Sequence, residues 1–197
     1  MWIFVGLGNP GKQYSSSRHN IGFMLIQRLA DKQNTKLKKR KYLSKAARVE
    51  LQHNPVLLVK PWTFMNNSGL AVKKLLDYTG AKLDRMLVVY DDLDIPLGEI
   101  RIRKSGGPGS HNGMASIVRE IDSTQFPRIR IGIGPLPPDL DATDFVLADF
   151  TKKERGIIDD CLVKTEESAM YILANDIEKA MTRFNRKVYD ESDGFLA

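Results

Sequence analysis

The chain has 197 residues, of which 42% are hydrophobic and 27% are charged. These values are typical of a globular protein that buries a core, and they exclude disordered and collagen-like chains. The single cysteine, Cys161, excludes an intramolecular disulfide and a thiolate metal cluster. The N-terminal segment has no basic leader and no long apolar run, so we expect a cytoplasmic protein without a membrane span.

In the first half of the chain, the spacing of apolar residues predicts a strand, a helix, a hairpin and a second helix. The apolar run Trp2–Leu7 is typical of a buried strand. His19–Ala30 and Ser68–Tyr78 carry apolar residues at helical spacing. Between these helices, Arg48–Leu51 and Val56–Val59 flank the turn sequence Gln-His-Asn-Pro, which predicts a hairpin.

The second half predicts three further strands and a third helix. Met86–Tyr90 is apolar and is expected to be a buried strand that ends before a group of acidic residues. Glu99–Lys104 and Arg128–Ile133 alternate charged and apolar residues, so each is expected to be a half-exposed strand. Ser110–Ile121 has the periodicity of a helix and follows a glycine-rich loop.

The C-terminal part is expected to be helical. Thr151 and Glu154 form a capping box at the start of a fourth helix, which is expected to break at Asn175-Asp176 before a last segment to Lys187. Strands and helices that alternate in this way predict one α/β domain over residues 1–197. Its mixed central sheet would be flanked by helices, with a C-terminal helical segment.

The net charge of +6 comes from 30 Lys and Arg against 24 Asp and Glu, and the basic residues fall in three groups. The run from Lys36 to Lys45 and the C-terminal group Arg183, Arg186 and Lys187 are interpreted as solvated surfaces. The middle group lies on the two predicted half-exposed strands, as Arg101, Arg103, Lys104, Arg128 and Arg130. If these strands share a face, the group forms a phosphate-binding patch; otherwise it is two independent solvated faces.

Two glycine motifs at the N-terminus are formal matches to nucleotide-binding patterns. Gly6–Gly11 fits G-x-G-x-x-G, and Gly6–Lys12 fits the first seven positions of a P-loop. Pro10, however, has no amide hydrogen to donate to a phosphate, and Gln13 replaces the hydroxyl residue that holds Mg²⁺. We therefore interpret the glycines as a tight turn and retain a nucleotide-dependent enzyme only as the weakest alternative.

Polar residues that could carry chemistry follow predicted strands or begin predicted helices. His19 and His111 each precede an asparagine at a helix start, and Asn9 and Asp91 follow buried strands. In open α/β sheets such positions surround the crevice beyond the carboxyl ends of the strands. A histidine is the default general base near neutral pH, and a carboxylate on its other nitrogen fixes the tautomer. Asp91 is the natural candidate for that carboxylate.

No residue in the sequence is typical of a covalent nucleophile. G-x-S-x-G is absent, and Cys161 lies within an apolar helical pattern, so direct attack by water is expected. Asparagine side chains could donate to a developing oxyanion, and Asn9, Asn66 and Asn112 are available. The acidic cluster Asp91-Asp92-x-Asp94 suggests a metal site, but H-E-x-x-H is missing, and we expect no metal.

Four segments together resemble bacterial-type peptidyl-tRNA hydrolases. They are FVGLGNPG–x2–Y–x3–RHN–x–G, KPWTFMNNSG, VVYDDLDIPLGEIRIRKSGGPGSHNG and RIRIGIG, and their ordered match covers nearly the whole chain. The resemblance implies a monomeric α/β domain that cleaves the ester joining a peptide to the 3′-terminal ribose of tRNA. Peptidyl-tRNA would be its partner, through the acceptor end and the phosphate backbone, and no metal or cofactor is implied.

The resemblance also implies roles by position. His19 is similar to the catalytic base, Asp91 to the residue that keeps its imidazole able to accept a proton, and Asn9 to the residue that distinguishes N-blocked peptidyl esters. The positions implied to contact substrate are Tyr14, Phe64, Met65, Asn66, Gly109, His111 and Asn112, with Arg103 and Arg130 on tRNA phosphate.

Two residues depart from the family pattern, and one alternative function stays open. Ser110 stands where glycine is common, and it would be strained if that position required a positive φ. Trp62 replaces a smaller residue and could touch substrate or shield a strand end. The alternative function is a non-catalytic RNA-binding paralogue of the same fold.

Overall fold

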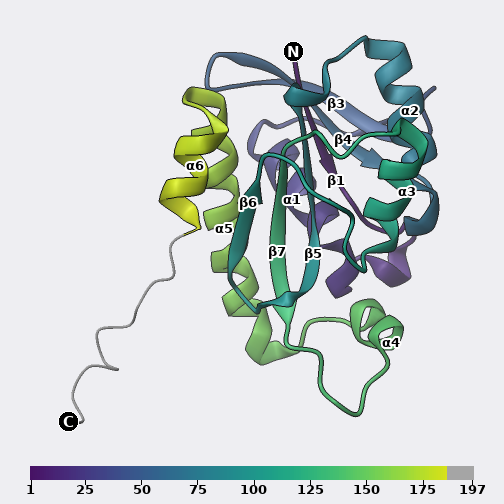
Figure 1. The fold of residues 1–197 in the computed structure, drawn as a ribbon, viewed down its shortest axis with the longest axis vertical. Coiled ribbons are helices and arrows are strands. Elements are labelled where there is room, and N and C mark those ends of the chain that lie inside the picture. Colours follow the sequence, from purple (N-terminus) through teal and green to yellow (C-terminus); the bar gives the residue numbers. More distant parts are fainter. Residues whose placement is uncertain (186–197) are drawn as a thin grey trace.

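A seven-stranded sheet forms the centre of the computed structural model, which describes residues 1–185 (Figure 1). The neighbouring strands β4, β1, β5 and β7 pair in parallel, whereas the pairs β2–β3, β3–β4 and β6–β7 are antiparallel. The mixed sheet that the sequence predicted is therefore confirmed. In spatial order the strands are β2 (Lys38–Arg40), β3 (Ser44–Leu51), β4 (Asn54–Pro61), β1 (Trp2–Gly6), β5 (Met86–Pro96), β7 (Arg128–Gly134) and β6 (Ile100–Arg103).

Helices cover both faces of the sheet and make a three-layer structure, with α2 and α3 on one side and α5 and α6 on the other (Figure 1). The core under α2 and α3 contains Val72 and Ile117, and the core under α1, α5 and α6 contains Leu25 and Leu162. The helices of the described residues are α1 (Ile21–Lys32), α2 (Ser68–Thr79), α3 (Asn112–Ile121), α4 (Ala142–Leu147), α5 (Lys152–Ala174) and α6 (Ile177–Phe184).

The central strands are buried on both faces because successive side chains alternate between the two cores. In β1, Ile3 and Val5 join the core under α2 and α3, whereas Phe4 joins the opposite core. In β5, Val88 and Val89 divide in the same way. Successive side chains of a strand point to opposite faces of the sheet. Because helices cover both faces here, both sets of side chains must be apolar, and the central strands are continuous apolar runs in the sequence.

Two predicted strands differ from the observed ones. β5 continues through the acidic cluster to Pro96, because it resumes pairing with β7 after a register shift between Asp92 and Pro96. β7 is almost wholly buried and not half-exposed, because it lies between β5 and β6 and its Arg128 side chain is enclosed. The alternation of charge in β7 therefore does not mark a solvent face.

The predicted helices are confirmed, and two short elements were missed. The capping box of Thr151 and Glu154 is present at the start of α5, which ends before Asn175. The missed elements are the edge strand β2 within the basic run and the short helix α4. The last predicted segment extended to Lys187, but its final residues, 186–187, lie outside the described residues. Within residues 1–185, none of the helices has the length and apolar character that crossing a membrane requires.

Candidate active site

The carboxyl ends of the parallel strands meet at one edge of the sheet, as the topology rule for open α/β sheets predicts. A crevice of about 860 Å³ lies there. It is lined by eleven of the twelve residues to which the resemblance gave a role: Asn9, His19, Phe64, Met65, Asn66, Asp91, Arg103, Gly109, His111, Asn112 and Arg130. Tyr14 is not among the lining residues; it ends a 3₁₀ turn, Lys12–Tyr14, beyond β1.

His19 reaches the crevice because α1 packs unusually close to the end of β1. A Cβ atom on Gly22 would lie 2.4 Å from the carbonyl oxygen of Val89 and 2.5 Å from the amide nitrogen of Leu7. Only glycine allows this approach. It places the 3₁₀ turn Arg18–Asn20, which precedes α1, against the ends of β1 and β5, where His19 is 8% exposed.

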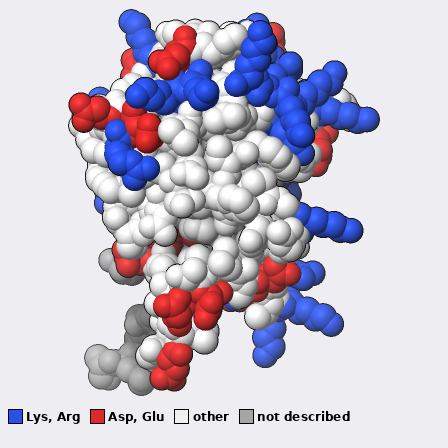
Figure 2. Space-filling model, turned by 90° about the vertical axis from the view of Figure 1, so that its right-hand side faces the viewer, with Lys and Arg blue, Asp and Glu red and all other residues white. Residues whose placement is uncertain are grey.

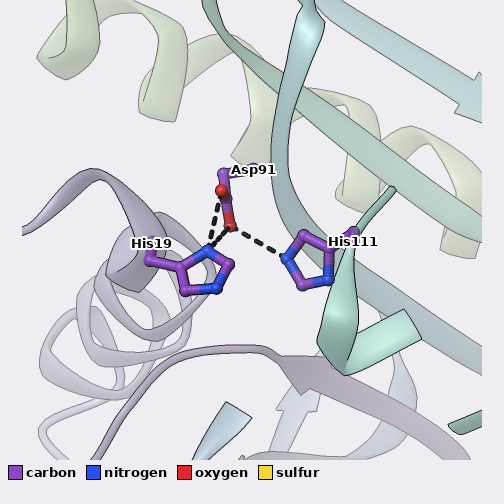
Figure 3. A group of neighbouring side chains, drawn as sticks. All are labelled: His19, Asp91 and His111. Atoms are coloured by element: carbon purple, nitrogen blue, oxygen red, sulfur yellow. Dashed lines mark hydrogen bonds and ion pairs between the residues drawn. The ribbon is translucent and has the colours of Figure 1, made fainter. Parts of the chain in front are cut away.

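His19 and Asp91 form a close hydrogen-bonded pair (Figure 3). The Nδ1 atom of His19 lies 2.9 Å from both carboxylate oxygens of Asp91. Because a carboxylate accepts and does not donate, Nδ1 carries the hydrogen. No residue of the described part of the chain hydrogen-bonds to Nε2, so this nitrogen keeps its lone pair and can accept a proton.

His111 contacts the same carboxylate from the opposite side (Figure 3). Its Nε2 atom lies 3.1 Å from Oδ1 of Asp91, and its Nδ1 atom accepts a hydrogen bond from the backbone N–H of Met114 as the N-cap of α3. An Nδ1 atom that accepts cannot carry a hydrogen, so Nε2–H donates to Asp91. The start of α3 thus fixes Nε2 of His111 as the donor to Asp91.

The two imidazoles keep Asp91 ionised although it is buried. Burial alone would raise the pKa of this carboxyl group. His19 and His111 outweigh that effect through charge and hydrogen bonding, and they hold the pKa well below its usual range. Asp91 therefore acts as an acceptor and a fixed negative charge over the whole working pH range.

One nitrogen of each ring and an oxygen of Asp91 lie within 4.8 Å of one another, a spacing that could hold a metal ion. A histidine that binds a metal normally carries its hydrogen on the other ring nitrogen and donates it to a neighbour. In His111 the other nitrogen accepts from Met114, so Nε2 could bind a metal only as an imidazolate. The hydrogen-bond pattern favours proton transfer over metal binding at these residues.

Asn9 is held rigidly at the centre of the crevice by two neighbouring segments. Its backbone N–H donates to Oδ1 of Asn20 at 2.7 Å, and its backbone carbonyl accepts from Nδ2 of Asn20 at 3.0 Å. Its side-chain Oδ1 accepts from the backbone N–H of Met65 at 2.8 Å. These bonds leave the Nδ2 group of Asn9 as a donor with no acceptor in the described residues, beside His19.

Three further residues with implied substrate contacts are exposed in the crevice. Asn66 lies in the 3₁₀ turn before α2, Asn112 is the first residue of α3, and Phe64 is 58% exposed. A single exposed apolar side chain is common on protein surfaces, so it is the place of Phe64 in the crevice, and not its exposure alone, that makes it available to a ligand. The amide groups of Asn66 and Asn112 are free to donate into the crevice.

The arginines of the middle basic group share one face of the sheet but do not have one role. Arg101 lies opposite Arg130, and Arg103 lies opposite Arg128 in the β6–β7 pair. Arg128, however, is 1% exposed and donates to four backbone carbonyls, so it is structural and does not belong to a phosphate patch. Arg130 is paired with Asp92 at 2.6 Å.

The other three members of this basic group differ in whether an acidic residue pairs with them. Arg101 is paired with Glu99, and Lys104 is paired with Glu178. Arg103 is exposed and has no hydrogen-bond or ion-pair partner within residues 1–185. Arg103 is therefore the member best placed to bind an anion.

The segment around α4 supplies crevice residues that the sequence analysis missed, namely Ala142, Thr143, Val146 and Leu147. Arg18 ties this segment to the turn that carries His19. Its guanidinium donates to the carbonyls of Ala148 and Asp149, pairs with Glu154 at 2.8 Å and lies 4.4 Å from the ring of Phe145. A signal for α4 was present in Asp141, which caps its N-terminus.

The two departures from the family pattern have structural outcomes. Ser110 is not among the residues with positive φ, whereas Gly109 before it has φ +60°, so serine at 110 causes no backbone strain. Trp62 stacks on Phe23, with ring planes 4° apart, and the Nζ atom of Lys45 lies 3.6 Å from its ring centroid.

Charge is distributed unevenly over the face formed by α2 and α3. Figure 2 shows Lys and Arg side chains along the upper part and one edge of this face, and Asp and Glu side chains at its lower end, level with α4. Basic and acidic side chains are thus partly segregated along this face.

Comparisons with known proteins give a consistent result. The family model described as peptidyl-tRNA hydrolase matches residues 3–192. A peptidyl-tRNA hydrolase of Fervidobacterium nodosum is 46% identical over 93% of this chain and 95% of its own length, and one of Thermoanaerobacter sp. (strain X514) is 42% identical over 94% and 100%. The crystal structure of peptidyl-tRNA hydrolase from Acinetobacter baumannii superposes with a TM-score of 0.87 at 33% identity, covering 94% of both chains.

Proposed function

Because this chain belongs to the peptidyl-tRNA hydrolase family, we propose that it cleaves the ester between a peptide and the 3′-terminal ribose of tRNA with His19 as the general base. The observation that carries the proposal is the His19–Asp91 pair, in which Nδ1 is bound at 2.9 Å and Nε2 is left with its lone pair. Such a pair activates water without a covalent intermediate or a metal ion.

In the proposed reaction, a water molecule donates one proton to Nε2 of His19 while its oxygen bonds to the ester carbonyl carbon. The carbonyl oxygen becomes an oxyanion, and the imidazole becomes an imidazolium. The negative charge of Asp91 stabilises this imidazolium but does not take the proton, as in other His–Asp pairs. Two N–H donors on Asp91 reinforce this role, because they hold its pKa low.

Collapse of the tetrahedral intermediate breaks the bond between the carbonyl carbon and the ribose oxygen. The proton on Nε2 of His19 passes to that oxygen, which restores the neutral base and releases tRNA with a free hydroxyl and a peptide with a carboxylic acid, which then loses its proton to solvent and becomes a carboxylate. Amide donors that surround His19 would stabilise the oxyanion. The Nδ2 groups of Asn9, Asn66 and Asn112 are the available donors, and the Met65 bond fixes Asn9 for this purpose.

One part of the tRNA phosphate backbone is proposed to lie along the β6–β7 side of the crevice. Arg103 and Arg130 line the crevice there and are suited to phosphate, because a guanidinium can bind two oxygens at once. Because Arg130 already forms an ion pair with Asp92, Arg103 would contribute more to phosphate binding. The peptide would then extend from the ester past Phe64.

The test is hydrolysis of N-acetyl-aminoacyl-tRNA by the purified protein with EDTA present, with the unacetylated aminoacyl-tRNA as a control substrate. We expect cleavage of the acetylated substrate only. His19→Ala should reduce turnover by at least about 100-fold, the usual value of general-base catalysis. Asp91→Asn should also reduce turnover while tRNA binding persists, because the asparagine amide would favour the wrong His19 tautomer.

Three results would count against the proposal. Loss of activity in EDTA would indicate a metal ion in place of the proton relay. Binding of tRNA without ester cleavage would indicate the non-catalytic alternative. Full activity of His19→Ala would place the general base elsewhere.

A further inference from the structure

A second hollow of about 1,030 Å³, here called the lysine groove, lies on the other side of Asn9, between α1 and the ends of β3 and β4. Asn9 lines both the lysine groove and the catalytic crevice, so the two adjoin at this residue. Six cations line the groove against one acid, Asp31; the cations are Lys12, Arg28, Lys32, Lys36, Lys45 and Lys60. The mechanism proposed above uses none of them.

Only two of these cations are neutralised by an acid. Arg28 and Lys32 both pair with Glu166, at 3.0 and 2.6 Å. Lys12, Lys36, Lys45 and Lys60 have no carboxylate partner within residues 1–185. The groove therefore keeps a strong positive charge that an anion could neutralise.

Lys60 is the most unusual member, because it is 9% exposed and carries its charge into the protein. Its Nζ donates to Oε1 of Gln27 at 2.8 Å, and Nε2 of Gln27 donates to Asp31, which fixes the orientation of the amide. An ammonium group has three hydrogens to donate, and residues 1–185 accept only one of them. Two donors of a nearly buried cation are thus left for a ligand.

Lys45 adds a second unneutralised charge directly beside Lys60. The two residues are opposite each other in the antiparallel β3–β4 pair. Like charges in this arrangement destabilise a sheet. Lys45 is held over the ring of Trp62 at 3.6 Å, and Trp62 is fixed in turn by stacking on Phe23. The ring of Trp62 therefore positions an ammonium group beside the groove.

The pKa of Lys60 agrees with a site that lacks its anion. Burial, opposed by Asp31 and reinforced by Lys45, lowers this pKa to about 8. A bound anion would raise it again and restore the full charge. Lys60 therefore destabilises the free protein in a way that ligand binding would relieve.

We propose that the lysine groove binds phosphodiester groups of the RNA substrate next to the ester, with Lys45 and Lys60 as the central contacts. This inference rests on the proposed function for the identity of the RNA. A polyanion fits better than a single anion, because the positive charge continues outward. Lys36 lines the groove, and Lys38, Lys39 and Arg40 are exposed on the adjoining edge strand β2. The basic run thus extends the groove and is not simply a solvated face.

The experiment measures the affinity for deacylated tRNA as a function of salt concentration for the wild type and for Lys45→Met/Lys60→Met. Each contact to a single-stranded phosphate contributes about 0.7 to the slope of log affinity against log salt. We expect the double variant to bind more weakly and to lower the slope by about 1.4. Lys73→Met/Lys74→Met removes the same charge from two exposed residues of α2 that line neither hollow, and it should keep the wild-type slope.

Lys45→Met alone serves if the double variant does not fold, because Lys45 is only partly buried, and it should lower the slope by about 0.7. Equal slopes for the groove variants and the α2 control would overturn the proposal. So would an unchanged slope together with a higher KM for N-acetyl-aminoacyl-tRNA, which would place the peptide in the groove. A phosphate-dependent thermal shift lost in the variant without a slope change would instead indicate free phosphate.

The measurement does not depend on ester cleavage, so the two proposals can fail separately. A protein that shows the slope change but does not hydrolyse N-acetyl-aminoacyl-tRNA would refute the proposed function and keep the groove. A protein that hydrolyses this substrate and shows no slope change would refute the groove alone.

Discussion

Arg128 allows the clearest test of what supports the crevice. If its role is structural, its replacement lowers the stability of the protein; if it binds phosphate, its replacement weakens tRNA binding instead. The guanidinium donates to the carbonyls of Gly106 and Gly107 at 2.6 and 3.1 Å, and to those of Thr124 and Phe126 at 2.9 and 3.3 Å. It therefore joins the glycine loop that leads to α3 with the loop that enters β7. Four carbonyl dipoles replace the counter-ion that a buried arginine would otherwise need.

The variant Arg128→Met removes every one of these bonds and keeps most of the side-chain volume. Each hydrogen bond to a charged donor contributes about 1.5–3 kcal/mol, but water can reach the partly exposed Gly106 and Gly107. We therefore expect the free energy of unfolding to fall by about 3 kcal/mol. Arg128→Lys keeps the charge but not the planar fork, and it should recover only part of this loss.

Urea denaturation measures the change in stability, and amide exchange of Gly106 and Gly107 reports the freedom of their loop. Arg103→Met is the matched control, because Arg103 is exposed on the same sheet face and should change stability by less than about 0.5 kcal/mol. If Arg128→Met were as stable as this control but lowered the salt dependence of tRNA binding, the structural role would be wrong. Arg128 would then be a phosphate contact.

Three further substitutions test other parts of the structure by urea denaturation. Gly22→Ala should destabilise the fold by about 1–3 kcal/mol or more and reduce turnover, because the new Cβ would lie 2.4–2.7 Å from backbone atoms of Val89 and Leu7. A variant as stable as the wild type would refute the close approach of α1 to β1. Lys60→Met should stabilise the protein at pH 7 by roughly 1–3 kcal/mol, because it removes a buried charge. The wild type should gain stability between about pH 8 and 10.5, where Lys60 has lost its proton in the folded protein but keeps it in the unfolded chain, and the variant should not show this rise. A wild-type stability that stays constant over this pH range would contradict the prediction. Thr151→Ala should cost about 1 kcal/mol through the lost cap of α5, and no loss would indicate that Glu154 alone caps the helix.

Much of the crevice could be predicted because a parallel sheet brings residues that are far apart in the sequence close together at the ends of its strands. His19 and Asp91 are 72 residues apart, and no local feature links them. Each follows or adjoins a buried strand, however, and parallel neighbouring strands bring their carboxyl ends to one edge. The strand order was not needed for this inference; the strand ends alone were sufficient.

What the sequence could not predict depends on loops that cover particular side chains. Arg128 and Arg130 are two residues apart on one strand and share a face, so alternation treats them alike. The 106–107 and 124–126 segments enclose only Arg128, and their course is set by distant packing. The interpretation of the Lys36–Lys45 run as a solvated face agrees with the exposure of Lys38–Arg40, but the sequence alone could not place Lys45 opposite Lys60.

The arrangement around Asp91 also gives the second histidine, His111, a role in the site. A buried carboxylate with a single imidazole partner would be under-solvated, and burial would raise its pKa toward a value at which it could take the proton itself. His111 opposes this by donating a second N–H to Asp91, and the hydrogen bond from the Met114 N–H to its other nitrogen fixes this tautomer. In the proposed reaction, the proton that His19 takes from water would therefore stay on His19 until the ribose oxygen takes it. In that reaction, the N-terminus of α3 would help to keep the proton on His19, through the hydrogen bond of His111 to Asp91.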